Sequence, residues 1–341
     1  MLVVGTIVGA GLASGQEIVV FFAQYGFVSL FFNVAIFFIF FFGIRNFLRF
    51  EKCTYENDFK KKKISNIFDI ISIVIFAIIG STMLAGASQL LSTYVYNFSF
   101  PVWEIVLILL SSFVCFLGIK ALTNLSIYLV PVVIFGIIYV CIKGATISTL
   151  SPPTFSTDVS TVSILIFSSI SYCCCNLVTA SKVIFDLGKS LSQKQASYVA
   201  FFSSLVLSII IFVIIISILI NDEMILFADL PLVFLANMIS KPVGIGFTVI
   251  ILACIITTLF ATQYSFINLL QEKFEKRKRF LYYIISILTF FFISLIGFGE
   301  IIKYLYPIIG AFGFVMIFFL KNLTFKSCFN STNYKIHSSR K

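Results

Sequence analysis

The chain has few charged residues for its length. Charged side chains make up 11% of its 341 residues and apolar side chains 60%, whereas a soluble globular domain carries about 25% charged residues. Apolar runs recur along the whole chain, which excludes both a soluble protein and a soluble domain with one membrane anchor. The sequence therefore predicts an all-α polytopic membrane protein, because in lipid each backbone group must be paired within its own segment.

Histidine and the common catalytic motifs are also scarce. The single histidine, His337, lies in a polar tail, and no HExxH, Walker or Ser–His–Asp pattern is present. We therefore expect no enzyme, and no cofactor apart from a coupling ion. Of the eight cysteines, Cys53 and Cys328 fall on the predicted inner side and the others within spans, so no structural disulfide is expected. The run Cys173–Cys175 points in directions about 100° apart on a helix, which indicates small apolar filler and no transition-metal site.

Ten apolar stretches are each long enough to cross a hydrocarbon core of about 30 Å. They cover residues 1–25, 27–49, 66–95, 102–119, 123–142, 161–187, 197–220, 243–270, 280–298 and 301–320. We interpret 1–320 as one ten-helix transmembrane domain and 321–341 as a polar, basic cytoplasmic tail. The first stretch lacks a basic leader and a cleavage site, so no cleaved signal peptide is expected.

Basic residues divide unequally between the two sides of this topology. With both termini inside, 21 of the 24 lysines and arginines fall in inner segments, and only Lys143, Lys241 and Lys303 in outer ones. Such a bias predicts a multi-pass protein of the cell membrane with both termini cytoplasmic. The net charge of +10 then reflects topology and not a nucleic-acid partner. The run Lys60–Lys63 is interpreted as a topology determinant that also meets anionic lipid of the bilayer.

Two of the ten stretches are unusual for membrane helices. "VVGTIVGAGLASGQEIVVFF", residues 3–22, holds four glycines and a carboxylate, although glycine weakens a helix and a charge in hydrocarbon is costly. The span 161–187 contains a polar cluster of Ser168, Ser169, Ser171, Tyr172, Asn176, Thr179 and Ser181. These stretches open the two five-span halves, which favours an inverted-repeat transporter with repeats 1–143 and 161–320. Close helix packing through small residues and hydroxyls bonded to their own backbone remain alternative interpretations.

Three motifs carry a resemblance to a known family. "GTIVGAGLASGQEIVVFFAQYG", residues 5–26, resembles the first-helix signature of the uncharacterised bacterial YkvI-type membrane proteins. "STMLAGAS", residues 81–88, and "YPIIGAFGF", residues 306–314, resemble the third and tenth helices of that family. The family looks like a branch of the amino acid–polyamine–organocation (APC) superfamily, whose members have the LeuT-type fold. The resemblance implies a five-plus-five inverted repeat with interrupted helices 1 and 6.

The resemblance also implies where a solute and an ion would bind. The stretch that resembles "GxxVGxG" would offer its carbonyl groups to sodium and its N–H groups to a solute carboxylate, and an adjacent pair of hydroxyls on helix 8 would complete the ion site. The sodium ligands implied are Gly5, Val8, Cys254, Thr257 and Thr258. The candidate solute-binding residues are Gly9, Ala10, Gly11, Ser171, Tyr172 and Asn176. Without the resemblance, a Thr-Thr pair in a membrane helix would be interpreted as packing.

Glu17 lies six residues beyond Gly11, about 9 Å along a helix. It is either a gating or proton-titrating carboxylate that faces the outer vestibule, or a solvated carboxylate that the N-terminus of a helix favours. The segment 222–242 is too polar and interrupted to span the membrane, and it is predicted to form a short outer surface segment.

Taken together, the sequence predicts a secondary active transporter that moves a small solute, an amino acid or related amine, by alternating access. The resemblance also favours sodium over proton coupling, because proton-coupled relatives of this fold can replace the sodium with a lysine on helix 5, and the stretch 124–141 of the fifth span has no charge at its middle. The alternative is a non-transporting receptor that senses a small solute with the same fold.

Overall fold

The computed structural model describes residues 2–50, 59–96, 98, 101–117, 120–147, 159–221, 224–274 and 278–315. Within these ranges every regular element is a helix, so the predicted all-α class is confirmed. The predicted tail 321–341 lies outside the described residues.

The first apolar segment consists of three short helices. They are α1 (Leu2–Ile7), α2 (Ala10–Ser14) and α3 (Gln16–Phe21). A 3₁₀ helix, η1 (Ala23–Leu30), follows and turns by 85° into α4 (Asn33–Phe50). The predicted second span, from residue 27, therefore falls on η1 and α4 as one bent pair, because Gly26 inside η1 has a positive φ of 71° that a regular helix does not allow.

The remaining helices are longer or lie at the surface. The long ones are α5 (Phe59–Tyr94), α7 (Lys120–Ile147), α8 (Val159–Ser190), α9 (Gln193–Leu219), α12 (Lys241–Lys273) and Phe298–Val315. The shorter ones are α6 (Val102–Leu117), α10 (Met224–Phe227), α11 (Pro231–Ile239) and α13 (Arg279–Ser294).

Six of these helices are long and apolar enough to cross a membrane, or seven if η1 and α4 count as one bent span. Two further apolar helices, at Val102–Phe116 and Phe280–Ser294, are shorter than a full crossing. A polytopic membrane protein is therefore confirmed, whereas a total of ten spans stays a prediction.

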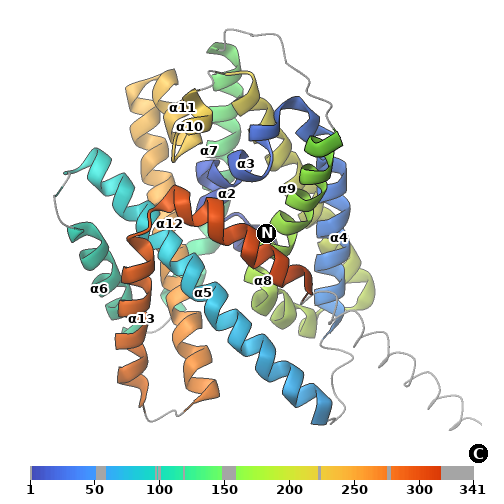
Figure 1. Ribbon diagram of the computed structural model, residues 1–341, viewed down its shortest axis with the longest axis vertical. Helices are drawn as coiled ribbons and strands as arrows, with labels where there is room; N and C mark the ends of the chain where they lie inside the picture. Colours follow the sequence, from blue (N-terminus) through green and yellow to red (C-terminus); the bar gives the residue numbers. More distant parts are fainter. Residues whose placement is uncertain are drawn as a thin grey trace, which may run out of the picture.

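The pieces of the first segment are surrounded by helices from distant parts of the sequence. Helix α1 contacts α7, α8 and α9, helix α2 contacts α7, α11 and α12, and α3 contacts α8 and α9. Helix α5 runs diagonally across the molecule beside α12 and α13, and the unlabelled helix Phe298–Val315 crosses the middle of the view (Figure 1). This arrangement places the interruptions of the first segment inside the molecule.

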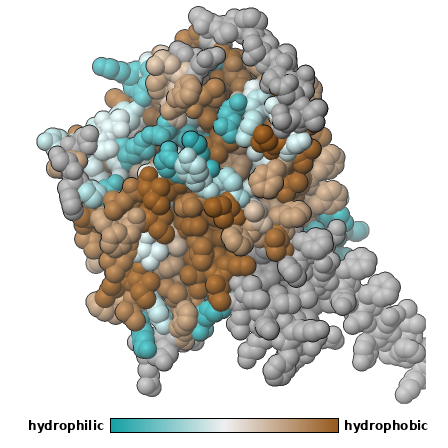
Figure 2. Space-filling view, viewed as in Figure 1, coloured by the Kyte–Doolittle hydropathy of each residue, from teal (hydrophilic) through white to brown (hydrophobic). Residues whose placement is uncertain are grey.

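Large apolar side chains cover much of the outer surface. Phe113 and Phe116 on α6 and Phe292 on α13 are exposed. Figure 2 shows this apolar surface over the lower half of the molecule, with hydrophilic side chains gathered above it. A contiguous apolar surface of this kind is expected where lipid replaces water as the solvent.

Candidate functional site

The first segment is interrupted at Val8 and Gly9, as the glycine pattern predicts. The N–H group of Gly9 donates to the Ile7 carbonyl (2.7 Å), so it does not continue the helical bond to Gly5. A second interruption follows at Gly15, whose φ of 85° is left-handed and favours glycine. Helix ends leave N–H and C=O groups without partners in their own helix, so main-chain polar groups become available within the interior.

The glycines of this segment serve two different purposes. A Cβ atom added at Gly5 would lie 2.6 Å from the Val130 side chain of α7, so Gly5 permits close helix packing, the alternative interpretation of the pattern. A Cβ atom at Gly9 would meet nothing closer than the Ile7 carbonyl oxygen at 4.0 Å. Space therefore opens beside the interruption at Gly9 and not at Gly5.

Glu17 folds back over the start of α2. A Cβ atom at Gly11 would lie 2.6 Å from Cδ of Glu17, so the carboxyl group occupies the space left by the missing side chain. Glu17 is only 5% exposed, and among the described residues its Oε2 atom has no hydrogen-bond partner. The Asn176 side chain faces this carboxyl group as a hydrogen-bonding neighbour. The solvated alternative for Glu17 is therefore wrong, because the group is buried.

Tyr172 and Asn176 lie next to Glu17, as a shared solute site requires. The Tyr172 ring packs against Phe21, Phe22 and Phe40, with centroid distances of 5.5, 5.3 and 6.1 Å. Its hydroxyl group is buried and has no hydrogen-bond partner in the described part of the chain. Tyr172 is also close enough to Glu17 for the two groups to interact electrostatically.

Ser171 points away from this group. Its hydroxyl donates to the Pro307 carbonyl (3.1 Å), and it occupies the place where a side chain at Gly310 would lie. Ser171 therefore joins α8 to the helix Phe298–Val315. Ala10 is the first residue of α2, and only its backbone is described.

The predicted interruption of helix 6 is wrong, because α8 continues from Val159 to Ser190 without a break. Its polar side chains bond to carbonyl groups of their own helix. Examples are Ser169 to Leu165 (2.8 Å) and Asn176 to Tyr172 (3.1 Å). Residues 164–185 contain neither glycine nor proline, so nothing forces the backbone out of the helix.

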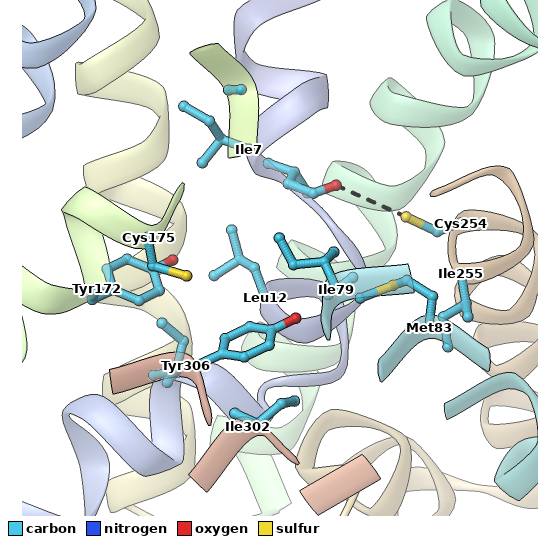
Figure 3. Packing of buried hydrophobic residues seen from close by; sticks show 14 of the residues in the cluster. Ile7, Leu12, Ile79, Met83, Tyr172, Cys175, Cys254, Ile255, Ile302 and Tyr306 are labelled. Atoms are coloured by element: carbon cyan, nitrogen blue, oxygen red, sulfur yellow. Dashed lines mark hydrogen bonds between the residues drawn. The ribbon is translucent and has the colours of Figure 1, made fainter. Parts of the chain in front are cut away.

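Helix α12 reaches the interruption of the first segment at Cys254. The Cys254 thiol donates to the Val8 carbonyl oxygen, 3.9 Å from the sulfur atom (Figure 3). Thr257 and Thr258 both donate to the Cys254 carbonyl, at 2.9 and 2.8 Å. The structure thus brings the Cys254 thiol to the Val8 carbonyl, whereas the Thr257 and Thr258 hydroxyls bond within their own helix.

Tyr306 and Gln16 are two further polar residues near the site to which the sequence assigned no role. The buried Tyr306 ring extends toward Leu12 and Ile79 (Figure 3), near Thr82 and Glu17. Gln16 is 8% exposed, and its Oε1 atom has no partner among the residues described. The motif "YPIIGAFGF" contains Tyr306, so the resemblance was the one sequence signal that could have identified it.

The described part of the predicted surface segment 222–242 forms two short helices and lies against Gly15. Helices α10 and α11 form it, and Leu232 lies 3.0 Å from the position of a Cβ atom on Gly15. The Asp229 carboxylate accepts a hydrogen bond from Gln89 of α5 (2.6 Å). The segment is therefore joined both to the first segment and to α5.

These features define a class: an α-helical, multi-span membrane protein whose first helix is interrupted around a buried carboxylate. The chain is 24% identical over 339 residues to the "Uncharacterized membrane protein YkvI" of Bacillus subtilis (strain 168), covering 95% of this chain and 93% of that protein. It is 23% identical over 322 residues to the "Uncharacterized protein YyaD" of the same organism, covering 91% of each. No family model matches the chain. The predicted resemblance to YkvI-type membrane proteins is confirmed.

Proposed function

We propose that the protein is a secondary transporter that moves a small solute with an amino group, an amino acid or related amine, across the cell membrane. The observation that carries this proposal is the Glu17 carboxyl group. It is buried against Gly11 at the interruption of the first helix, and no lysine or arginine of the described residues pairs with it.

An unpaired carboxylate in a membrane protein is costly, and such residues mark pathways for ions and substrates. The Glu17 Oε2 atom, the Tyr172 hydroxyl and the Gln16 Oε1 atom are buried without partners in the described part of the molecule. An ammonium group donates up to three hydrogen bonds and carries the complementary charge. A solute with this group would satisfy the Glu17 Oε2 atom, which has no partner among the described residues.

Main-chain N–H groups at the interruption would bind the carboxylate group of an amino acid. The N–H groups of Ala10 and Gly11 belong to the first turn of α2, where no helical carbonyl can accept them. They would take the negative end of a zwitterion, and Glu17 and Asn176 the positive end. Open space lies beside Gly9, next to these N–H groups in the chain.

Sodium is the proposed coupling ion. The carbonyl oxygens of Val8 and Cys254 and the hydroxyls of Thr257 and Thr258 are hard oxygen ligands that suit such a cation. The contact of the Cys254 thiol with the Val8 carbonyl supports this assignment because it brings α12 to the interruption, and the Gly5 carbonyl is a further proposed ligand. The proposed architecture is the LeuT-type five-plus-five repeat of ten spans with both termini cytoplasmic, operating by alternating access and without enzymatic chemistry.

Uptake by the purified protein tests the proposal. Amino acids and amines are first screened for thermal stabilisation of the protein with and without sodium, and those that stabilise it are then tested for uptake into liposomes. We expect sodium-stimulated uptake, and at least about tenfold weaker solute affinity in Glu17→Gln, which removes a charge-assisted hydrogen bond but keeps the shape.

Glu300→Gln is the matched control, because Glu300 is an exposed carboxylate on another helix and should leave uptake unchanged. Solute binding without uptake would favour the receptor alternative. If wild type and Glu17→Gln show equal uptake, Glu17 does not bind an amino group of the solute, and that part of the proposal is wrong.

A further inference from the structure

Two arginines lie on one face at the end of α4. Arg45 and Arg49 are four residues apart, which places them one above the other on the helix. Arg49 reaches across to α9, where its Nη2 atom donates to the Ser197 hydroxyl (3.1 Å). The two guanidinium groups therefore lie at the junction of α4 and α9, away from the interruption of the first segment.

These guanidinium groups are incompletely paired. The Nε atoms of both Arg45 and Arg49 are buried and have no hydrogen-bond partner among the described residues. The two positive charges are also close enough to repel each other. The Phe41 ring lies 5.9 Å from the Arg45 guanidinium carbon, but the ring face offers no oxygen acceptor. Buried donors without an acceptor are costly, and within the described part of the chain the pair has no anionic partner.

The surface that leads to the arginines is apolar and aromatic. The Phe201 ring of α9 lies 5.8 Å from that of Phe37 and 6.3 Å from that of Phe41, which joins the two helices in one aromatic layer. Phe42 and Phe202 extend this layer and are exposed. In a membrane, acyl chains would cover these rings.

More positive charge lies at the start of α9. Lys194 is exposed and stands one turn before Ser197. The first turn of α9 also directs N–H groups and the positive end of the helix toward this region. Several hydrogen-bond donors therefore meet where the apolar layer ends.

We propose that this junction, which we call the α4–α9 arginine site, binds the headgroup of an anionic phospholipid. Its phosphate oxygens would accept hydrogen bonds from Arg45 and Arg49, since planar guanidinium groups match phosphate geometry. Basic pockets between membrane helices are known to hold acidic headgroups. The occupant is a lipid and not free phosphate because the donors lie at the end of an exposed apolar surface on two membrane helices.

Lipid binding to the full-length protein tests this site. Delipidated protein in neutral detergent is titrated with phosphatidylglycerol or with phosphatidylcholine, and binding is followed by native mass spectrometry and by thermal stabilisation. We expect phosphatidylglycerol to bind at least about tenfold more tightly than phosphatidylcholine, and Arg45→Gln/Arg49→Gln to abolish that preference.

Lys273→Gln is the matched control, because it removes one positive charge at the end of α12 and should keep the preference. If the double variant does not fold, the lipid preference is measured on the single variant Arg45→Gln, which leaves the hydrogen bond between Arg49 and Ser197 intact. The proposal is overturned if the two lipids bind equally or if the arginine variants retain the preference. It is equally overturned if glycerol phosphate stabilises the protein as well as phosphatidylglycerol does, because the site would then be one for a soluble phosphate.

Discussion

Gly9 has an extended backbone, with φ of −85° and ψ of −175°, that any residue can adopt. Its small size therefore matters more than its conformational freedom. We expect Gly9→Leu to fold and yet to lose solute binding, because the new side chain would enter the open space beside the interruption. Thermal unfolding and solute uptake measured on the same preparation check this prediction.

Gly246→Leu is the control for Gly9→Leu. Gly246 also has open space around its Cβ position, but it lies near the start of α12, away from the site. It should keep both stability and uptake. Full uptake by Gly9→Leu would place the solute elsewhere.

Removal of the Thr258 hydroxyl group tests the proposed ion site. Thr258→Val removes an oxygen ligand and nearly preserves the side-chain volume. Loss of a hydrogen-bonding or ligating partner of a charge costs about 1.5–3 kcal/mol, so we expect the sodium concentration for half-maximal stabilisation to rise about ten- to hundredfold. The measurement is a sodium titration of the unfolding temperature, with Thr262→Val, four residues further along α12, as the control. Unchanged sodium dependence in both Thr257→Val and Thr258→Val would contradict the ion assignment.

At the scale of the element, α12 is joined to two shorter helices by a buried amide. Gln263 accepts a hydrogen bond from Ser111 of α6, and it donates to Ser112 (2.8 Å) and to Ser286 of α13 (3.1 Å). Polar bonds of this kind hold membrane helices together, at about 0.6 kcal/mol each on average. They matter most here because α6 and α13 are the two shorter apolar helices.

We expect Gln263→Leu to destabilise the protein by about 1–3 kcal/mol, because three serine hydroxyls would lose a partner. The unfolding temperature in detergent is the measurement. Gln271→Leu on the same helix is the comparison, since the Gln271 Nε2 atom has no partner among the described residues and its loss should cost less. Equal stability of the two variants would contradict a stabilising role for the Gln263 network.

The elements also show what the sequence could and could not predict. The four glycines in a membrane segment left interruption and close packing both open, and the resemblance favoured the interruption that the structure shows at Val8 and Gly9. The polar cluster of α8 looked similar, yet its side chains bond to their own helix, and sequence spacing cannot distinguish the two outcomes. The position of Glu17 over Gly11 depends on how α3 turns back at Gly15, so it was not predictable from spacing along a straight helix.

At the scale of the whole molecule, the distribution of basic residues predicts which surfaces face the cytoplasm. Lys241 and Lys278 are both exposed, at the two ends of the region that contains α12. In a cysteine-free background, a membrane-impermeant thiol reagent added to intact cells should label Lys241→Cys and not Lys278→Cys. Permeabilised cells provide the control, where both should react. The reverse pattern in intact cells would invert the topology.

The divided first helix also affects how the protein is made. A segment that bends twice within its first 20 residues and carries a carboxylate is a poor substrate for the insertion machinery, which favours continuous apolar helices. Its main neighbours, α7, α8 and α9, are synthesised more than 100 residues later. The first segment of a nascent chain would therefore lack these neighbours until α8 and α9 had been synthesised. Its packing would then be a late step of assembly.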